Sequence, residues 1–229
     1  MKKIAVIPAR SGSKGLKDKN IIDLNGRPLI YYTIKAALDS GCFDEIMVST
    51  DSAAYAEIAR ENGADVPFLR SSELSGDCAG SWDVVREVLR EYGRLGRRFD
   101  YVALLQPTSP LRDATDIASA FDKLACCGVH NVVSVTEVDH PVQWCFRLTE
   151  RGTMDEMAAS PYSYMRRQDL DKHYRENGAI YIVDAKKISD ASYNFYADNC
   201  AGFIMPREQS IDIDTEVDLL VAKMLLQKK

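Results

Sequence analysis

The 229-residue sequence lacks three features that would each place it in a broad class of protein. It carries 29 lysines and arginines against 34 aspartates and glutamates, whereas proteins that bind nucleic acid generally have basic surfaces. No apolar stretch reaches the length that spans a membrane. The six cysteines are scattered without metal-ligand spacing, and the adjacent pair Cys126 and Cys127 cannot form a C-x-x-C motif. We therefore expect a cytoplasmic protein with reduced thiols and neither a nucleic-acid nor a membrane partner.

Standard phosphate-binding fingerprints are also missing, although residues 3–20 combine an apolar run with a basic loop. The run 4–7 stops at Pro8, and the spacing of Gly12 and Gly15 fits neither a P-loop nor the dinucleotide motif. Glycine permits backbone conformations closed to other residues, so we expect amides of this loop to face an anion. The loop cations add the charge that a triphosphate would need, and a solvent-exposed basic loop is the alternative. These cations are Arg10, Lys14, Lys17 and Lys19.

Segments with the pattern of strands alternate with helical segments along the first 136 residues. We expect strands at 4–7, 45–50, 66–69, 101–105 and 131–136, and helices at about 28–40, 53–62, 82–92 and 113–125. This alternation predicts an α/β fold with a doubly wound, mostly parallel sheet. Ligands in such sheets bind beyond the carboxyl ends of the strands. Loops that each follow a strand are therefore expected to share one rim, namely 8–20, 49–51, 70–80 and 106–112.

Residues 138–177 interrupt the alternation, since they are rich in aromatic and basic residues without a helical period. We expect an arm or hairpin there. The sheet should resume at 179–183 and 203–205, and a last helix should begin near Thr215. Its apolar face is predicted to contain Val217, Leu220, Val221, Met224 and Leu225. Because no repeat or linker is evident, we expect one domain over 1–229.

Six ordered stretches resemble the CMP-sialic acid synthetases, or N-acylneuraminate cytidylyltransferases. They are IPARSGSKGLKDKN (7–20), VSTD (48–51), LRSSELSGD (69–77), LLQPTSPLR (104–112), YRENGAIYI (174–182) and SIDIDTEVDL (210–219). The resemblance implies a Rossmann-like nucleotidyltransferase fold that joins CTP and a nonulosonic acid, typically N-acetylneuraminate, with release of pyrophosphate. It implies Mg²⁺, or else Mn²⁺, as cofactor. It also implies a homodimer in which an arm, here 138–177, closes the partner's sugar pocket.

The same resemblance assigns the nucleotide half of the site. Arg10, Ser13, Lys14, Lys19 and Asn20 match positions that contact the triphosphate and nucleotide. We expect Lys14 and Lys19 to hold phosphates and Arg10 to stabilise the charge that develops on them. The positions of Arg70, Ala79 and Ser81 surround cytidine in the family. An ordinary surface cation is the alternative for Arg70, and a helix cap is the alternative for Ser81.

Asp212 and Asp214 are predicted to bind the metal ion. Residues two apart in an extended segment point to the same side, and paired carboxylates together with phosphate oxygens suit Mg²⁺. The alternative is that Asp214 or Thr215 caps the last helix with Asp218, which explains at most one of the two aspartates.

The acceptor half rests on four positions that match the family's sugar contacts. The amide of Gln106 suits a sugar hydroxyl or carboxylate. Arg167 and Arg175 suit the acceptor carboxylate, with Arg167 acting from the partner subunit, and Tyr181 completes the set. One departure is Gln143, which stands where some relatives have lysine.

Three other interpretations remain open from the sequence. The acceptor could be legionaminate, pseudaminate or 3-deoxy-octulosonate. Asp212-Ile213-Asp214 is formally the D-x-D of a metal-dependent glycosyltransferase. A degenerate nucleotide-binding protein is the third. No Ser-His-Asp or Cys-His arrangement is evident, so we expect no covalent intermediate.

Overall fold

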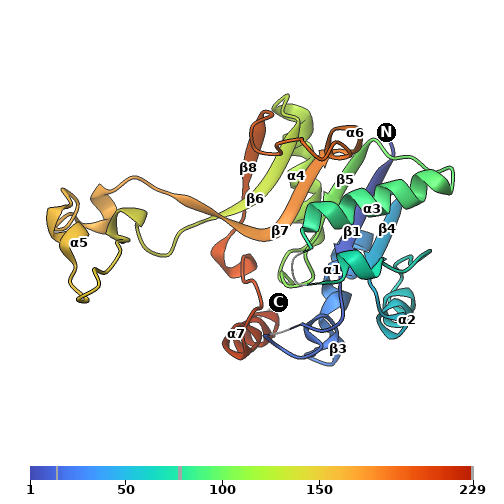
Figure 1. Cartoon of the computed structure of the whole chain (residues 1–229), viewed down its shortest axis with the longest axis horizontal. Helices are drawn as coiled ribbons and strands as arrows, with labels where there is room; N and C mark the ends of the chain where they lie inside the picture. The colour runs from blue at the N-terminus through green and yellow to red at the C-terminus, as the bar shows by residue number, and fades with distance from the viewer. Residues whose placement is uncertain (14, 77–78, 228–229) are drawn as a thin grey trace.

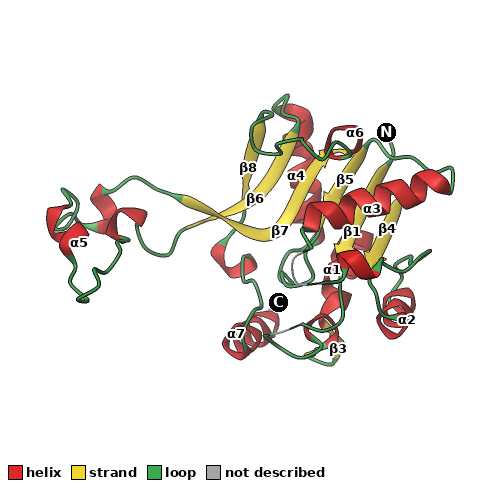
Figure 2. Ribbon diagram, viewed as in Figure 1, coloured by secondary structure: helices red, strands yellow, loops and turns green. Residues whose placement is uncertain are grey.

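A six-stranded sheet forms the centre of the molecule, in the order β4-β1-β5-β7-β6-β8 (Figure 1, Figure 2). The computed structural model describes residues 1–13, 15–76 and 79–227. Neighbouring strands are parallel except at β7, which runs antiparallel to both β5 and β6, and this confirms the mostly parallel sheet. The strands are β1 (Lys3–Pro8), β4 (Glu45–Ser49), β5 (Tyr101–Leu104), β6 (Asn131–Glu137), β7 (Tyr174–Asp184) and β8 (Cys200–Ile204).

Helices cover both faces of the sheet, because successive strand residues point to opposite sides. Ala5 and Ile7 of β1 pack with α1, α2 and α4, whereas Ile4 and Val6 pack with α3 and α6. None of the helices in the described residues is long and apolar enough to cross a bilayer. The helices are α1 (Leu29–Ser40), α2 (Ala53–Glu61), α3 (Ser81–Arg94), α4 (Ala114–Cys126), α5 (Asp155–Ala159), α6 (Ala185–Ile188) and α7 (Glu216–Leu226), with a small hairpin of β2 (Asp23–Leu24) and β3 (Arg27–Pro28).

The predicted strand at 66–69 is wrong. On the side of β4 away from β1, the described residues form an isolated bridge between Met47 and Asp65 and no strand. Pro67 has no amide hydrogen to donate and restricts the backbone of Val66, so the ladder stops after Asp65. At the other side of the sheet, β7 begins at Tyr174 rather than at 179, and β8 covers 200–204 rather than 203–205.

The predicted apolar face of the last helix is also wrong. Leu219 and Ala222 of α7 are buried, but Val217, Leu220 and Met224 are each more than half exposed. The apolar residues of α7 are spread around the helix, so spacing alone did not identify the buried side. At its start, Thr215 forms a capping box with Asp218, as the alternative for that segment proposed.

An arm between β6 and β7 projects away from the sheet (Figure 1). It covers 138–173, because the last predicted arm residues, 174–177, already belong to β7. It contains the short helix α5 and two 3-10 turns, Val142–Trp144 and Arg167–Asp169. No residue from 142 to 176 is buried, and Tyr164 is fully exposed. The arm therefore has no buried core of its own.

Candidate active site

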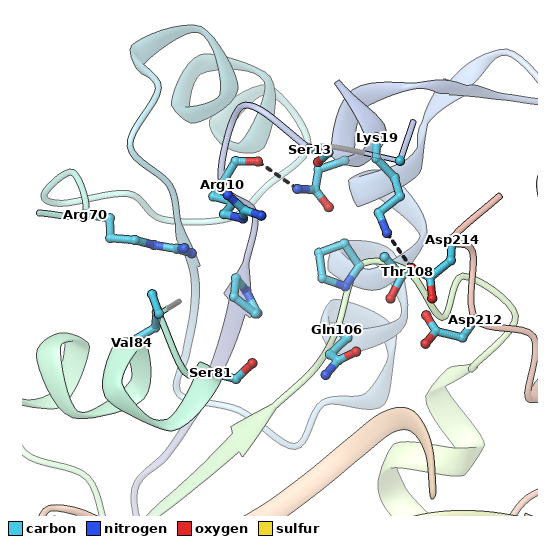
Figure 3. Close-up of a pocket in the computed structure, with 15 residues that line it drawn as sticks. Arg10, Ser13, Lys19, Arg70, Ser81, Val84, Gln106, Thr108, Asp212 and Asp214 are labelled. Atoms are coloured by element: carbon cyan, nitrogen blue, oxygen red, sulfur yellow. Dashed lines mark hydrogen bonds and ion pairs between the residues drawn. The ribbon is translucent and has the colours of Figure 1, made fainter. Parts of the chain in front are cut away.

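A cavity of about 400 Å³ lies where β1 and β5 end at the carboxyl side of the sheet (Figure 3). Loops 8–20, 70–80 and 106–112 all contribute to its wall, which confirms the shared rim for these three. The segment 212–214 completes the wall. The predicted residues that line the cavity are Arg10, Ser13, Lys19, Asn20, Arg70, Ala79, Ser81, Gln106, Asp212 and Asp214.

The loop after β1 is held in place from three directions. The Ser11 amide and hydroxyl both donate to the Asp51 carboxylate at 2.7 Å, so loop 49–51 braces the site without lining it. The Asn20 side chain donates to the carbonyl oxygen of Arg10 at 3.0 Å. Leu16 is buried against Ile213. These contacts fix the backbone that carries Ser13 and Lys19. Asn20, which was predicted to contact the nucleotide, also stabilises this loop.

Arg70 combines a structural and a ligand-facing position. Its Nε donates to Ser49 Oγ at 3.0 Å, and its Nη2 donates to the Ser49 carbonyl at 2.5 Å. Only 7% of the residue is exposed, yet it still lines the cavity. Burial lowers the pKa of Arg70 to about 10. The charges of Asp51 and Glu87 oppose this shift, and the charge of Arg10 adds to it. Two cations on one side of the cavity favour an anionic ligand there (Figure 3).

Ser81 is not the cap of α3, contrary to the alternative for that residue. Gly80 occupies the N-cap position, and no side chain caps the helix. Ser81 is the first helical residue and lines the cavity with Val84 from the next turn. Its hydroxyl is thereby directed to the cavity rather than to the helix backbone (Figure 3).

Lys19, Asp212 and Asp214 lie on the opposite side of the cavity (Figure 3). Lys19 Nζ donates to Asp214 Oδ1 at 2.8 Å across 195 positions of sequence. Ile213 is fully buried between the two aspartates, and its amide donates to the Thr108 carbonyl at 2.8 Å. Both carboxylates therefore reach the cavity, as the extended spacing predicted. Since Thr215 is the N-cap of α7, capping accounts for neither aspartate.

Asp212 has an unusual environment for a carboxylate. Its Oδ1 is buried and has no hydrogen-bond partner among the described residues. Burial raises the pKa of Asp212, the charge of Asp214 raises it further, and a hydrogen bond from Thr108 opposes the shift. An oxygen that is buried without a donor is costly unless a cation satisfies it.

The two carboxylates fit a magnesium ion. The described residues contain no group of three or more His, Cys, Asp or Glu side chains that could hold a metal. Mg²⁺ commonly takes one or two protein carboxylates and completes its shell with phosphate oxygens and waters. The orphaned Oδ1 of Asp212, with Asp214 beside it, has the chemistry of such a partial site.

Gln106 packs closely against β7. Gly178 has a φ of +75°, and a Cβ at that position would lie 3.0 Å from Gln106 Oε1 and 3.6 Å from Asp212 Oδ2. Only glycine allows both this conformation and this approach. Gly178 therefore brings the Gln106 amide and the Asp212 carboxylate to one side of the cavity.

Three predicted site residues in the described part of the chain do not line this cavity, namely Arg167, Arg175 and Tyr181. Lys14 lies outside the described residues. Arg167 lines a separate groove at the base of the arm, and Arg175 is exposed on β7. Tyr181 is 8% exposed and lies in an aromatic cluster with Trp82 and Phe195, where its hydroxyl donates to Glu176 at 2.9 Å. Their roles stay predictions.

Sequence reasoning named neither Thr108 nor Gly15 as a contact of the acidic pair. Thr108 stands between Pro107 and Pro110 in the loop after β5. A polar residue in such a loop indicates a ligand site, because ligands bind beyond the carboxyl ends of the strands. Gly15 does not have the left-handed backbone that Gly12 adopts at φ +72°. A Cβ at Gly15 would lie 3.0 Å from the Asp214 carbonyl, so a close approach explains this glycine. Pro8, Val84 and Pro107 also line the cavity.

Comparison with known proteins identifies the family to which this chain belongs. Residues 4–203 match the family model described as cytidylyltransferase. An N-acylneuraminate cytidylyltransferase of Streptococcus agalactiae is 41% identical over 96% of this chain, but the match covers 52% of that protein, so the chain spans about half its length. A CMP-N,N'-diacetyllegionaminic acid synthase of Legionella pneumophila is 38% identical, with 99% and 97% of the two chains covered.

A solved structure supports the fold. CMP:2-keto-3-deoxy-manno-octonic acid synthetase, complexed with CTP, superposes with a TM-score of 0.73 over 100% of this chain and 99% of that one, at 18% identity. The six ordered sequence motifs, the sheet and the family match agree. The chain belongs to the cytidylyltransferase family.

Proposed function

We propose that this chain transfers CMP from CTP to the anomeric hydroxyl of a nonulosonic acid, with N-acetylneuraminate as the preferred acceptor. One observation carries the proposal. A single cavity has Arg10 and Arg70 on one side and Lys19, Asp212 and Asp214 on the other. Such a cavity can hold a nucleoside triphosphate with its phosphates between cations and carboxylates.

The chemistry asks the protein mainly for alignment and charge. The acceptor oxygen attacks the α-phosphorus, one P–O bond forms, and the bond to pyrophosphate breaks while the acceptor proton passes to solvent. Lys19 binds the phosphates, and Arg10 stabilises the charge that develops on them. Lys14 shares this task in the proposal. Arg70 and Ser81 are the proposed contacts of the cytidine.

Asp212 and Asp214 would hold Mg²⁺, or Mn²⁺ in its place. Bound there, the ion supplies positive charge to the phosphate oxygens and to the acceptor oxygen. The protein's own part is to fix the positions of the two carboxylates. The Ile213 amide holds the segment between them by donating to the Thr108 carbonyl, and the Thr108 side chain forms a hydrogen bond with Asp212.

Pyrophosphate release tests the proposal. Purified protein with CTP and Mg²⁺ is expected to release pyrophosphate only when an acceptor acid is added. The acids to compare are N-acetylneuraminate, N,N'-diacetyllegionaminate, pseudaminate and 3-deoxy-octulosonate. Release with another acid alone would replace the proposed acceptor and keep the reaction. Acceptor-dependent consumption of a CMP-sugar without use of CTP would favour the glycosyltransferase instead.

The arm is proposed to form a homodimer that completes the acceptor site. Apolar side chains are exposed along it, including Leu148, Met154, Tyr162 and Tyr164. Burial of such residues against a second copy would give the arm the core that it lacks. Arg167 lies at the base of the arm, outside the cavity of its own chain, which suits a residue that acts on the partner's site.

Replacing Tyr164 with arginine is expected to convert a dimer into a monomer, because a charge would enter the apolar contact. Size-exclusion chromatography with light scattering measures the mass. Acceptor-dependent turnover should fall about tenfold or more while CTP binding stays within about twofold. Leu95→Arg is the matched control, since Leu95 is 59% exposed after α3 and remote from the arm. A wild-type monomer that is fully active would contradict the proposed dimer.

A further inference from the structure

Arg112 is a buried cation that the proposed chemistry does not use. It ends the stretch LLQPTSPLR, and only 2% of it is exposed. Burial lowers the pKa of Arg112 to about 10, while the charge of Asp116 opposes the shift, so the guanidinium stays charged at neutral pH. Charged side chains are almost never fully buried unless they are paired or bonded. A specific set of contacts must therefore compensate for this burial.

The guanidinium joins three separate elements. Its Nη1 donates to the carbonyl oxygens of Gln106 at 3.2 Å and Ala179 at 2.9 Å. Its Nη2 donates to the hydroxyl of Thr33 on α1 at 2.6 Å. Thr33 is fully buried and donates in turn to the Gln106 carbonyl at 3.4 Å. One side chain thus fixes the loop after β5, the strand β7 and helix α1 to one another.

The two carbonyls that share Nη1 flank the contact between Gln106 and β7. Ala179 follows Gly178, whose backbone lies against both the Gln106 amide and the Asp212 carboxylate. The distance between the loop and β7 therefore sets where the Gln106 amide lies relative to Asp212. No other side-chain donor among the described residues bonds both carbonyls.

A neighbouring buried network fixes the acidic segment to the same strand. Asn177 Nδ2 donates to Ser210 Oγ at 2.9 Å, and Ser109 Oγ donates to the Asn177 carbonyl at 3.4 Å. These bonds tie 210–213, the loop after β5 and β7 together. On the other side, the Gln106 carbonyl accepts from Arg112, from the Thr33 hydroxyl and from the Ser109 amide, and of these donor groups only the Arg112 guanidinium also bonds β7.

We propose that Arg112 is a positioning residue for the acceptor half of the cavity, because it holds the backbone of Gln106 against β7 and so sets the spacing between the Gln106 amide and the Asp212 carboxylate. This inference rests on the proposed function. The planar fork of arginine can serve three acceptors at once, whereas the single ammonium of lysine lacks the reach and the fixed directions. A misplacement of about 1 Å can lower turnover by up to about 10²-fold.

The experiment compares Arg112→Lys with Thr33→Val, which removes one partner of the guanidinium. Both variants are expected to bind CTP within about twofold of wild type, while the KM for N-acetylneuraminate rises about tenfold or more and kcat falls. Thr33→Ser keeps the hydroxyl and should restore the KM. If Arg112→Lys does not fold, the Thr33 pair decides the question alone.

Tyr92→Phe is the matched control for lost stability. The Tyr92 hydroxyl is buried and donates to Glu45 at 2.5 Å, at the start of β4 and thus at the sheet edge opposite the cavity. It should lower the melting temperature without changing either KM. The positioning role is overturned if Arg112→Lys and Thr33→Val behave like this control. Failure of wild type to use any of the acids would instead overturn the proposed function, and the inference with it.

Discussion

Asp212→Asn is expected to lower kcat by about 10³-fold or more and, in the same variant, to raise the melting temperature of the metal-free protein. The activity falls because an amide supplies no negative charge to a cation on the phosphates. Stability rises because the folded chain no longer keeps a buried, unpartnered carboxylate oxygen ionised. Loss of function with a gain in stability distinguishes a functional carboxylate from a structural one.

The pH dependence of that gain follows from the direction of the pKa shift. Burial, with the charge of Asp214 in addition, raises the pKa of Asp212 in the folded chain. The folded state then holds a proton more tightly than the unfolded state, so ionisation destabilises the fold at neutral pH. The gain in stability from Asp212→Asn should be fully present at pH values above the raised pKa of Asp212. This gain should vanish as the pH falls below the ordinary pKa of an aspartate, where Asp212 is protonated in the folded and the unfolded chain.

Melting curves in EDTA between pH 3 and pH 8, with turnover assays in Mg²⁺, provide the measurement. Asp44→Asn is the matched control, because its Oδ2 accepts from the Lys3 amide at 2.7 Å, beside the amino end of β1. That variant should keep full turnover and show no gain in stability. A fully active Asp212→Asn variant would contradict the proposal that Asp212 binds the metal ion. A drop in its melting temperature at neutral pH would contradict the statement that burial of the ionised carboxylate destabilises the fold.

The sequence predicted those parts of the fold that depend on local pattern. The alternation of apolar strands and helices was sufficient for the sheet and for the rim shared by loops 8–20 and 106–112, which follow the parallel strands β1 and β5. It failed where one residue changes the backbone, as Pro67 does beside β4. It failed again at α7, where leucines and valines surround the helix and only tertiary contacts select the buried side.

The site was predicted unevenly for similar reasons. Local spacing was enough to place Asp212 and Asp214 on one side, but the contact with Lys19 spans 195 positions and needs the folded chain. Arg112 lies inside a quoted motif, yet charge alone suggests a surface position, and only the structure reveals the three acceptors that surround it. Arg167 lines a separate groove in its own chain, and its proposed contact with the acceptor needs a second copy.

Lys19→Met is expected to raise the dissociation constant of CTP and to lower kcat/KM by about 10²–10³-fold. Lys19 Nζ pairs with Asp214 at 2.8 Å, and the Lys19 side chain is 16% exposed while that of Asp214 is 72% exposed. An ion pair so open to solvent contributes about 0–1 kcal/mol to folding, so the melting temperature should hardly change. The substitution should therefore weaken CTP binding rather than folding, because the phosphates lose a cation that is fixed at the cavity wall.

Lys35→Met is the matched control, because Lys35 forms an exposed ion pair with Asp39 at 2.5 Å on α1, outside the cavity. Titration calorimetry with CTP at two salt concentrations separates the cases. Wild type and Lys35→Met should lose affinity for CTP equally as salt rises, whereas Lys19→Met should show a smaller loss, since it has one cation fewer to screen. Equal salt dependence in all three proteins would mean that Lys19 serves Asp214 rather than the triphosphate. In that case Arg10 would be the cation to replace next.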